Sequence, residues 1–137
     1  MSLTRKIDFA VVFSVKHANP NGDPLNGNRP RTTYEGFGEV SDVCLKRKLR
    51  DRLMDAGESI FVQSDDRRND AYLTLLQRAK GELKGVKPAD YEKAACGKWF
   101  DVRAFGQVFA FKKEGKGDAD AVSVGVRGPV TLQSAFS

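Results

Sequence analysis

Residues Ile7 to Leu53 read IDFAVVFSVKHANPNGDPLNGNRPRTTYEGFGEVSDVCLKRKLRDRL, and the rest of the chain is interpreted as support for this unit. Apolar residues occupy every second position from Ile7 to Val15. In a pleated strand this alternation points the apolar side chains to one face. Because Ala10 and Val12 make the other face apolar as well, the pattern predicts a central strand that is covered on both sides.

A loop rich in turn-forming residues follows the predicted strand. Between Asn19 and Pro30, prolines alternate with asparagine and glycine. Prolines remove backbone donors, and asparagine and glycine tolerate positive φ, so neither a helix nor a strand ladder is expected to continue here. The loop also places amide and backbone donors beside Arg29 and Arg31, which suits an anion such as phosphate. A plain surface loop is the alternative.

The start of this loop has part of the spacing of a calcium-binding loop. Asn19, Asn21 and Asp23 occupy the first, third and fifth positions of such a loop. The motif then requires a glycine and, at its end, a bidentate glutamate, and those places hold Pro24 and Pro30. Calcium binding is therefore not predicted, and no other metal site or cofactor is expected.

A basic helix is predicted from Ser41 to Leu53. The Ser41 hydroxyl can cap the first turn, and three leucines at intervals of four residues are predicted to form one buried line, since each residue turns the helix by about 100°. Five lysines and arginines lie between Cys44 and Arg52, with only Asp51 against them. They form one row on each flank of the leucine line: Lys46 and Arg50, and Lys48 and Arg52. Such a helix either binds phosphate or simply solvates an exposed face, and the arginines of the neighbouring loop favour binding.

The middle of the chain predicts supporting structure. Gly57 is expected to end the basic helix, and the apolar cluster at 59–63 predicts a short strand. Helical spacing at 72–79 and a second short helix after Pro88 follow. Residues 64–97 are therefore predicted to be an inserted helical subdomain with a scaffold role.

Towards the end of the chain, Val102, Phe105 and Phe109 fall on one arc of a helix, so residues 99–109 are predicted to be helical with aromatic side chains in the core. Asp101 and Arg103 would then face solvent or pair locally. A base-stacking strand of an RNA-recognition motif is the alternative, but it would need aromatic residues where Gln107 and Ala110 stand. A loop is predicted at 112–121, and strand alternation from 122 to 132 is interrupted at Pro129.

Length and composition limit the possible functions. A chain of 137 residues is most simply one domain, and its net charge of +5 favours anionic partners. No apolar run approaches the roughly 20 residues of a membrane span and no hydrophobic leader follows Met1, so a cytoplasmic location without a membrane is expected. Only one histidine, His17, is present, which excludes multi-histidine metal sites.

Four segments, in this order, resemble a known family. NPNGDP with GNRPR, SDVCLKRKLR, WFDVRAFGQVF and VSVGVRGPVTLQ are similar to the repeated backbone subunit of type I-C CRISPR Cascade complexes, in the repeat-associated RNA-binding superfamily. The resemblance implies an α+β fold with a modified RNA-recognition-motif (ferredoxin-like) core and an antiparallel sheet over residues 1–137. Family members are longer, so the chain is expected to be an amino-terminal portion.

The resemblance also implies a function. Several copies would bind the backbone of a guide RNA without catalysis and present its bases for pairing with target DNA in antiviral defence, beside other Cascade subunits. Positioning contacts of this kind carry no sequence information. The residues expected to contact RNA are Asn19, Asn21, Arg29, Arg31, Ser41, Lys46 and Arg50. The alternatives are a metal-dependent target-RNA endonuclease subunit that uses Asp23, and a base-reading RNA-recognition module.

Overall fold

A computed structural model describes residues 4–111 and 122–137, and the chain divides into two compact units. Unit 1 comprises residues 1–40 and 135–137, and unit 2 comprises residues 41–134. Helices and strands occur together, and the described strands pair antiparallel in three two-stranded sheets, which fits the predicted α+β class. The loop predicted at 112–121 lies outside the described residues.

Unit 1 is built from short strands and turns. Strand β1 (Gly22–Asp23) pairs with β2 (Arg29–Pro30) around a 3-10 turn, η1 (Pro24–Asn26), and β3 (Glu39–Val40) pairs with β6 (Ala135–Phe136). Each ladder is only two residues long. For β1 and β2, this agrees with the prediction that the prolines and glycines of the loop at 19–30 keep a ladder from continuing.

The prediction of a strand from Ile7 to Val15 is wrong. This segment is extended, but it forms no ladder with any described strand, and its apolar side chains are exposed by 45% to 96%. Alternation specifies which side chains share a face, but a strand also requires a neighbouring edge for its N–H and C=O groups. Within the described residues of unit 1, no other segment supplies that edge.

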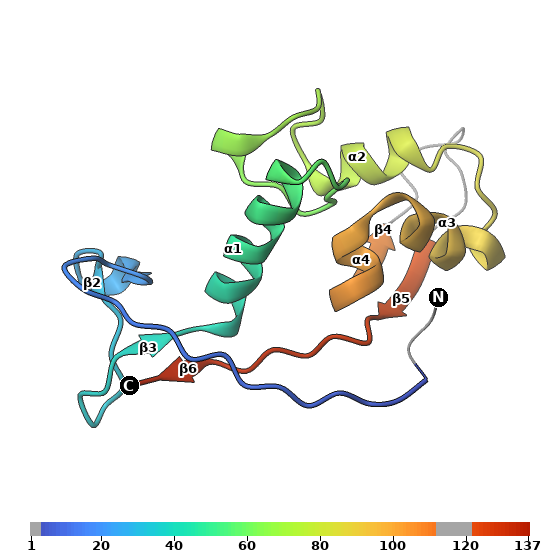
Figure 1. The fold of residues 1–137 in the computed structure, drawn as a ribbon. Coiled ribbons are helices and arrows are strands. Elements are labelled where there is room, and N and C mark those ends of the chain that lie inside the picture. Colours follow the sequence, from blue (N-terminus) through green and yellow to red (C-terminus); the bar gives the residue numbers. More distant parts are fainter. Residues whose placement is uncertain (1–3, 112–121) are drawn as a thin grey trace. The chain divides into compact units, whose positions relative to one another are not determined.

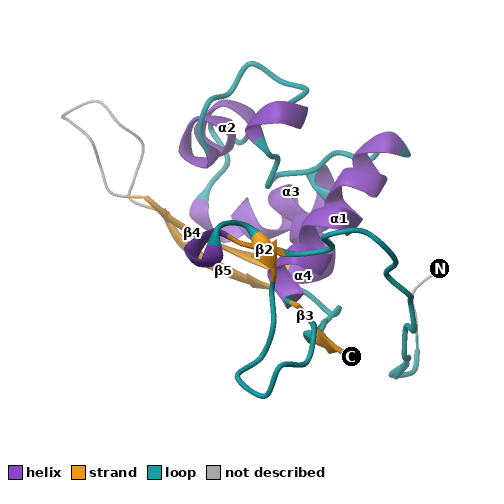
Figure 2. Ribbon diagram, turned by 90° about the vertical axis from the view of Figure 1, so that its left-hand side faces the viewer, coloured by secondary structure: helices purple, strands orange, loops and turns teal. Residues whose placement is uncertain are grey.

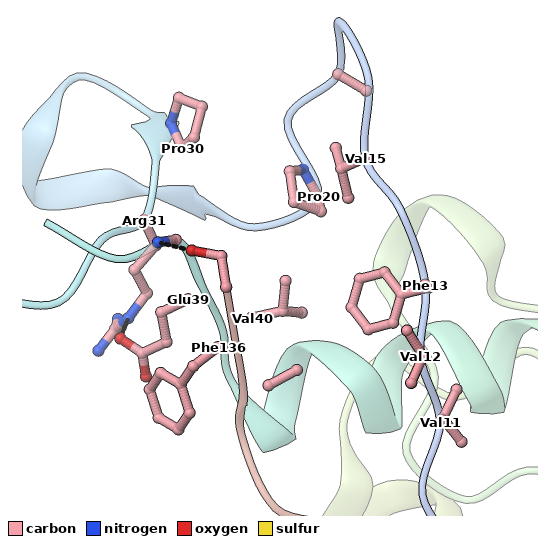
Figure 3. A pocket seen from close by; sticks show the side chains of 14 residues that line it. Val11, Val12, Phe13, Val15, Pro20, Pro30, Arg31, Glu39, Val40 and Phe136 are labelled. Atoms are coloured by element: carbon pink, nitrogen blue, oxygen red, sulfur yellow. Dashed lines mark hydrogen bonds and ion pairs between the residues drawn. The ribbon is translucent and has the colours of Figure 1, made fainter.

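The extended segment borders a groove in unit 1 of about 420 Å³. Its lining is mostly apolar and includes Phe13 of the extended segment, Val40 of β3 and Phe136 of β6 (Figure 3). The charged side chains in the lining are Arg31 and Glu39, which form an ion pair with a distance of 2.9 Å between Nε and Oε2. The groove is therefore apolar with a neutralised polar edge.

Unit 2 contains the helices and one β-hairpin (Figure 1). The helices are α1 (Asp42–Asp55), α2 (Leu75–Glu82), α3 (Tyr91–Lys98) and α4 (Phe100–Phe105), with 3-10 turns η2 (Asp65–Arg67) and η3 (Pro88–Asp90). Strands β4 (Gly106–Phe111) and β5 (Val122–Arg127) pair over their whole length (Figure 2). Strand structure stops before Pro129, as predicted, but it does not resume at 130–132, where the alternation predicted it. None of the helices in the described part of the chain has the length and apolarity needed to cross a membrane.

The core of unit 2 joins the helices of 64–97 to the hairpin. Its buried residues are Phe61, Ala79, Leu83, Tyr91, Ala95, Trp99, Val102, Phe109 and Val126. Phe109 lies at the centre, because its ring contacts those of Phe61 and Tyr91 at centroid distances of 5.1 Å and 5.3 Å. The helices between 64 and 97 therefore contribute side chains to the same core as β4 and β5.

The predicted helix at 99–109 is correct only in its first half. Helix α4 ends at Phe105, and Gly106, with φ of 80°, begins strand β4. A Cβ at Gly106 would lie 2.5 Å from the carbonyl oxygen of Val126, so the close approach of β5 requires glycine here. The core positions of Val102 and Phe109 were predicted correctly, but Phe109 reaches the core from a strand.

Two further predictions in unit 2 are wrong. Residues 59–63 are buried in part, as their apolar character indicates, but they form bends and no strand. The leucine line of α1 is not buried, since no residue of α1 is buried and Leu49 is 41% exposed. Other contacts must therefore hold both segments in place.

Candidate nucleic-acid interface

The loop at 19–30 is held together by its own polar side chains. The Asp23 carboxylate accepts a hydrogen bond from the Leu25 N–H at 3.0 Å and caps η1, and the chain then passes through Gly27 and Asn28 with positive φ. A Cβ at Gly22 would lie 1.9 Å from Oδ1 of Asn28, so a larger residue there would displace the Asn28 side chain. Asp23 thus has a structural role as the N-cap of η1.

The predicted RNA contacts in this loop are partly occupied by internal bonds. The Asn19 amide donates to the carbonyl of Asn28 at 2.7 Å, and the Asn21 amide donates to the carbonyl of Gly22 at 3.1 Å. Both asparagines therefore shape the loop. A partner outside the chain would have to use the remaining donor capacity of their amides.

The two arginines of the loop differ. The hydrogen bond from Arg31 to Glu39 raises the pKa of the guanidinium above its ordinary value, so this cation is already paired. Arg29 is exposed, and no ion pair of Arg29 is found within residues 4–111 and 122–137. Arg29 is the loop cation that is most accessible to an anion.

Helix α1 begins and ends as predicted. The Ser41 hydroxyl accepts a hydrogen bond from the Cys44 N–H at 3.4 Å, and Asp42 lies in the first turn, where a carboxylate favours the helix dipole. After Ala56, Gly57 adopts φ of 87° and ends the helix. Ser41 therefore has a capping role at the N-terminus of α1.

The predicted contacts Lys46 and Arg50 have different environments. Lys46 pairs with Asp42 one turn earlier, with 3.2 Å between Nζ and Oδ2, and this pair is only partly screened from solvent. Arg50 donates from Nε to Oδ2 of Asp101 at 2.9 Å, and its guanidinium lies 5.4 Å from the centroid of the Phe105 ring. Lys46 remains accessible to a phosphate, whereas Arg50 is engaged inside unit 2.

The other flank of α1 carries the more accessible cations. Lys48 is exposed, and 83% of the Arg52 side chain is exposed, although Arg52 pairs at 3.5 Å with Asp55. The sequence predicted that Lys48 and Arg52 form one row, but it gave no reason to prefer this row to Lys46 and Arg50 as an anion-binding surface. The partner that distinguishes the rows is Asp101. It was predicted to face solvent or to pair locally, but it is 1% exposed and pairs with the distant Arg50, so that prediction is wrong.

The predicted contact set is divided between the two units. Its loop residues, from Asn19 to Arg31, belong to unit 1, and its helix residues, from Ser41 to Arg50, belong to unit 2. Each group is therefore described within its own unit. In each, accessible cations lie beside side chains that are engaged in internal hydrogen bonds or ion pairs.

The outward face of β4 provides no surface for base stacking. Val108 and Ala110 are exposed on that face, while Phe109 points into the core. In the described chain, no group of three or more histidine, cysteine, aspartate or glutamate residues is placed to hold a metal ion.

Comparison with known proteins identifies the family. A family profile described as "CRISPR-associated protein Cas7" matches residues 5–137. A relative from Haloferax volcanii, named "CRISPR-associated protein Cas7", is 33% identical over an aligned length of 129, and the match covers 88% of this chain. The chain spans 37% of the length of that curated relative. It therefore belongs to the Cas7 family of CRISPR-associated proteins.

Proposed function

We propose that this chain contributes to a non-catalytic RNA-binding backbone subunit of a CRISPR effector complex of type I-C. The observation that carries this proposal is the match to the Cas7 family over residues 5–137. In the proposed role, several copies bind one guide RNA in the cytoplasm together with other Cascade subunits. Their contacts leave the bases of the guide free to pair with target DNA. The modified RNA-recognition-motif core, with the chain as its amino-terminal part, belongs to the same proposal.

The proposed contacts follow from accessibility. Arg29 in the loop, and Lys46 on α1 together with its exposed neighbours Lys48 and Arg52, offer positive charge to phosphate groups. Asn19, Asn21, Arg31 and Ser41 shape the loop and the start of α1, and they remain in the proposed set of RNA contacts. Arg50 supports the helix. These are contacts to phosphate and sugar, which suit a subunit that must accept any guide sequence.

The absence of catalysis is also part of the proposal. The Asp23 carboxylate is used in capping η1, which supports a turn role over cleavage. With Mg²⁺ present, target RNA should stay intact. Metal-dependent cutting that disappears in Asp23→Ala would instead establish the endonuclease alternative.

Fluorescence anisotropy with two unrelated RNA sequences of equal length tests the binding role. Each phosphate contact contributes a slope of about 0.7 to the dependence of log affinity on log salt for single strands. Lys46→Ala with Lys48→Ala should therefore lower the slope by about 1.4, and should weaken binding similarly for both sequences. A loss confined to one sequence would favour the base-reading module. The proposal fails if the wild-type chain binds neither RNA at low salt.

A further inference from the structure

Helix α1 is not held in unit 2 by the burial of an apolar face. None of its residues is buried, and the core cluster of unit 2 contains no side chain from α1. Most helices in proteins gain their stability and orientation from packing of such a face. The orientation of α1 must therefore depend on other contacts to a larger extent than usual.

Asp101, in the first turn of α4, supplies the best-formed of these contacts. Its Oδ1 accepts a hydrogen bond from the Phe61 N–H at 2.7 Å, and its Oδ2 accepts from the Val62 N–H at 3.1 Å and from Nε of Arg50 at 2.9 Å. Only 1% of Asp101 is exposed, so this carboxylate requires these donors to offset its loss of hydration. One buried group thus joins α4, the 61–62 segment and α1.

Two further arginines complete the same cluster. Arg47 of α1 donates to the carbonyl of Val62 at 2.9 Å, and Arg78 of α2 donates to the carbonyl of Phe61 at 2.8 Å. The peptide groups of the 61–62 segment, which have no strand ladder, are therefore satisfied by side chains of α1, α2 and α4. We call Asp101, Arg47, Arg50 and Arg78 the carboxylate clasp.

Because of the clasp, the cationic side chains of α1 differ in their exposure to solvent. The Arg50 side chain is 13% exposed because it is drawn to Asp101 and Phe105, whereas the Arg52 side chain is 83% exposed. Residues at positions 48 and 52 are neighbours on one helix face. When Arg50 is held inward, the Lys48 and Arg52 row faces away from the clasp and is available to a polyanion.

We propose that Asp101 is the positioning residue of the RNA-binding helix. By holding Arg50 it fixes α1 in the orientation that presents Lys48 and Arg52 to the RNA backbone, and Arg50 itself makes no RNA contact. This proposal rests on the proposed RNA-binding function.

For Asp101→Asn, the proposal and simple electrostatics predict opposite changes in RNA affinity. The substitution removes one negative charge, so a charge-only view predicts tighter RNA binding. Loss of the clasp predicts weaker binding at the same salt concentration, because α1 is no longer fixed. Asp55→Asn is the matched control: it removes an equal charge at an exposed position of α1, where Asp55 pairs with Arg52 and Arg67, and it should leave binding unchanged or tighter.

Variants of α1 separate positioning from direct contact. Arg50→Gln should lower the Tm by about 10 °C, as expected for loss of one partner of a buried ion pair, and should weaken RNA binding as Asp101→Asn does, because α1 is no longer fixed. Lys48→Gln should leave the Tm unchanged and lower the slope by about 0.7. Arg50→Lys keeps the charge but not the guanidinium geometry, so it should still lower the Tm and weaken RNA binding, whereas a direct phosphate contact at position 50 would survive this change.

RNA anisotropy over a salt series, and thermal melts followed by circular dichroism, measure all of these variants at a temperature where each retains its helical signal. Unchanged or tighter binding in Asp101→Asn, or wild-type RNA affinity in Arg50→Lys, would overturn the proposal. If Asp101→Asn does not fold, Arg50→Lys decides the question by its RNA affinity and Tm. If the wild-type chain binds no RNA, the proposed function fails first, and non-additive Tm losses of Asp101→Asn and Arg50→Gln would still reveal the clasp as a purely structural cluster.

Discussion

Replacement of Phe109 by alanine tests the core of unit 2 and the strand assignment of β4 together. Phe109 has no exposed surface, and its ring is surrounded by those of Phe61, Tyr91, Phe111 and Trp99 at centroid distances of 5.1 to 6.4 Å. A buried Phe→Ala change costs about 3–5 kcal/mol, and four neighbouring rings place this site near the upper end. We therefore expect a loss of about 4–5 kcal/mol in the free energy of unfolding.

The preceding residue provides the control. Val108 is 70% exposed, because successive side chains of a strand point to opposite faces, so Val108→Ala should change the free energy of unfolding by no more than about 0.5 kcal/mol. Urea unfolding followed by circular dichroism measures both variants, and the fluorescence of Trp99, the one tryptophan of the chain, reports on the same core. A loss below about 1 kcal/mol for Phe109→Ala, or equal losses for both variants, would refute this account of β4.

Two other predictions concern unit 2. Hydrogen bonds from Arg78 hold the pKa of Asp70 below its ordinary value, so the stability that this carboxylate contributes is present above an unfolded pKa of about 3.9 and is lost as the pH falls through the lower folded value. Urea titrations from pH 5 to pH 2 should show this loss in the wild type, and Arg78→Leu should reduce it; an unchanged pH dependence would contradict the pairing. Gly106→Ala should destabilise the chain by more than Gly85→Ala in thermal melts, because both have positive φ, but only at Gly106 would the new Cβ meet backbone, 2.5 Å from the Val126 carbonyl.

Local signals in the sequence predicted the ends of elements well. Ser41 caps α1 and Gly57 ends it, since both roles depend on chain neighbours alone. The boundary between α4 and β4 depends instead on the approach of β5 to Gly106, which lies about 20 residues earlier in the chain. Helical and strand spacing both place Phe109 in the core, so its burial was predicted although its secondary structure was not.

The failed strand predictions have a common cause. An apolar cluster predicts burial, and Ile60 and Phe61 are indeed buried at 1% exposure. Whether such a segment forms a ladder depends on what satisfies its peptide groups. At 61–62 these partners are side chains of residues as distant as Asp101, and no periodicity within the segment could show that.

For the candidate site, too, the sequence alone could not predict a property that depends on distant residues, namely which cations of α1 are accessible. The sequence counts five cations on α1, and this number suffices to predict a positive helix. It does not say which cations face outward, because that depends on which acids are buried nearby. Asp101, more than 40 residues from α1, pairs with Arg50, whose side chain is only 13% exposed, while Lys48 and Arg52 remain exposed. The charge pattern thus predicts a positively charged helix, and the buried carboxylate shows which of its cations are accessible.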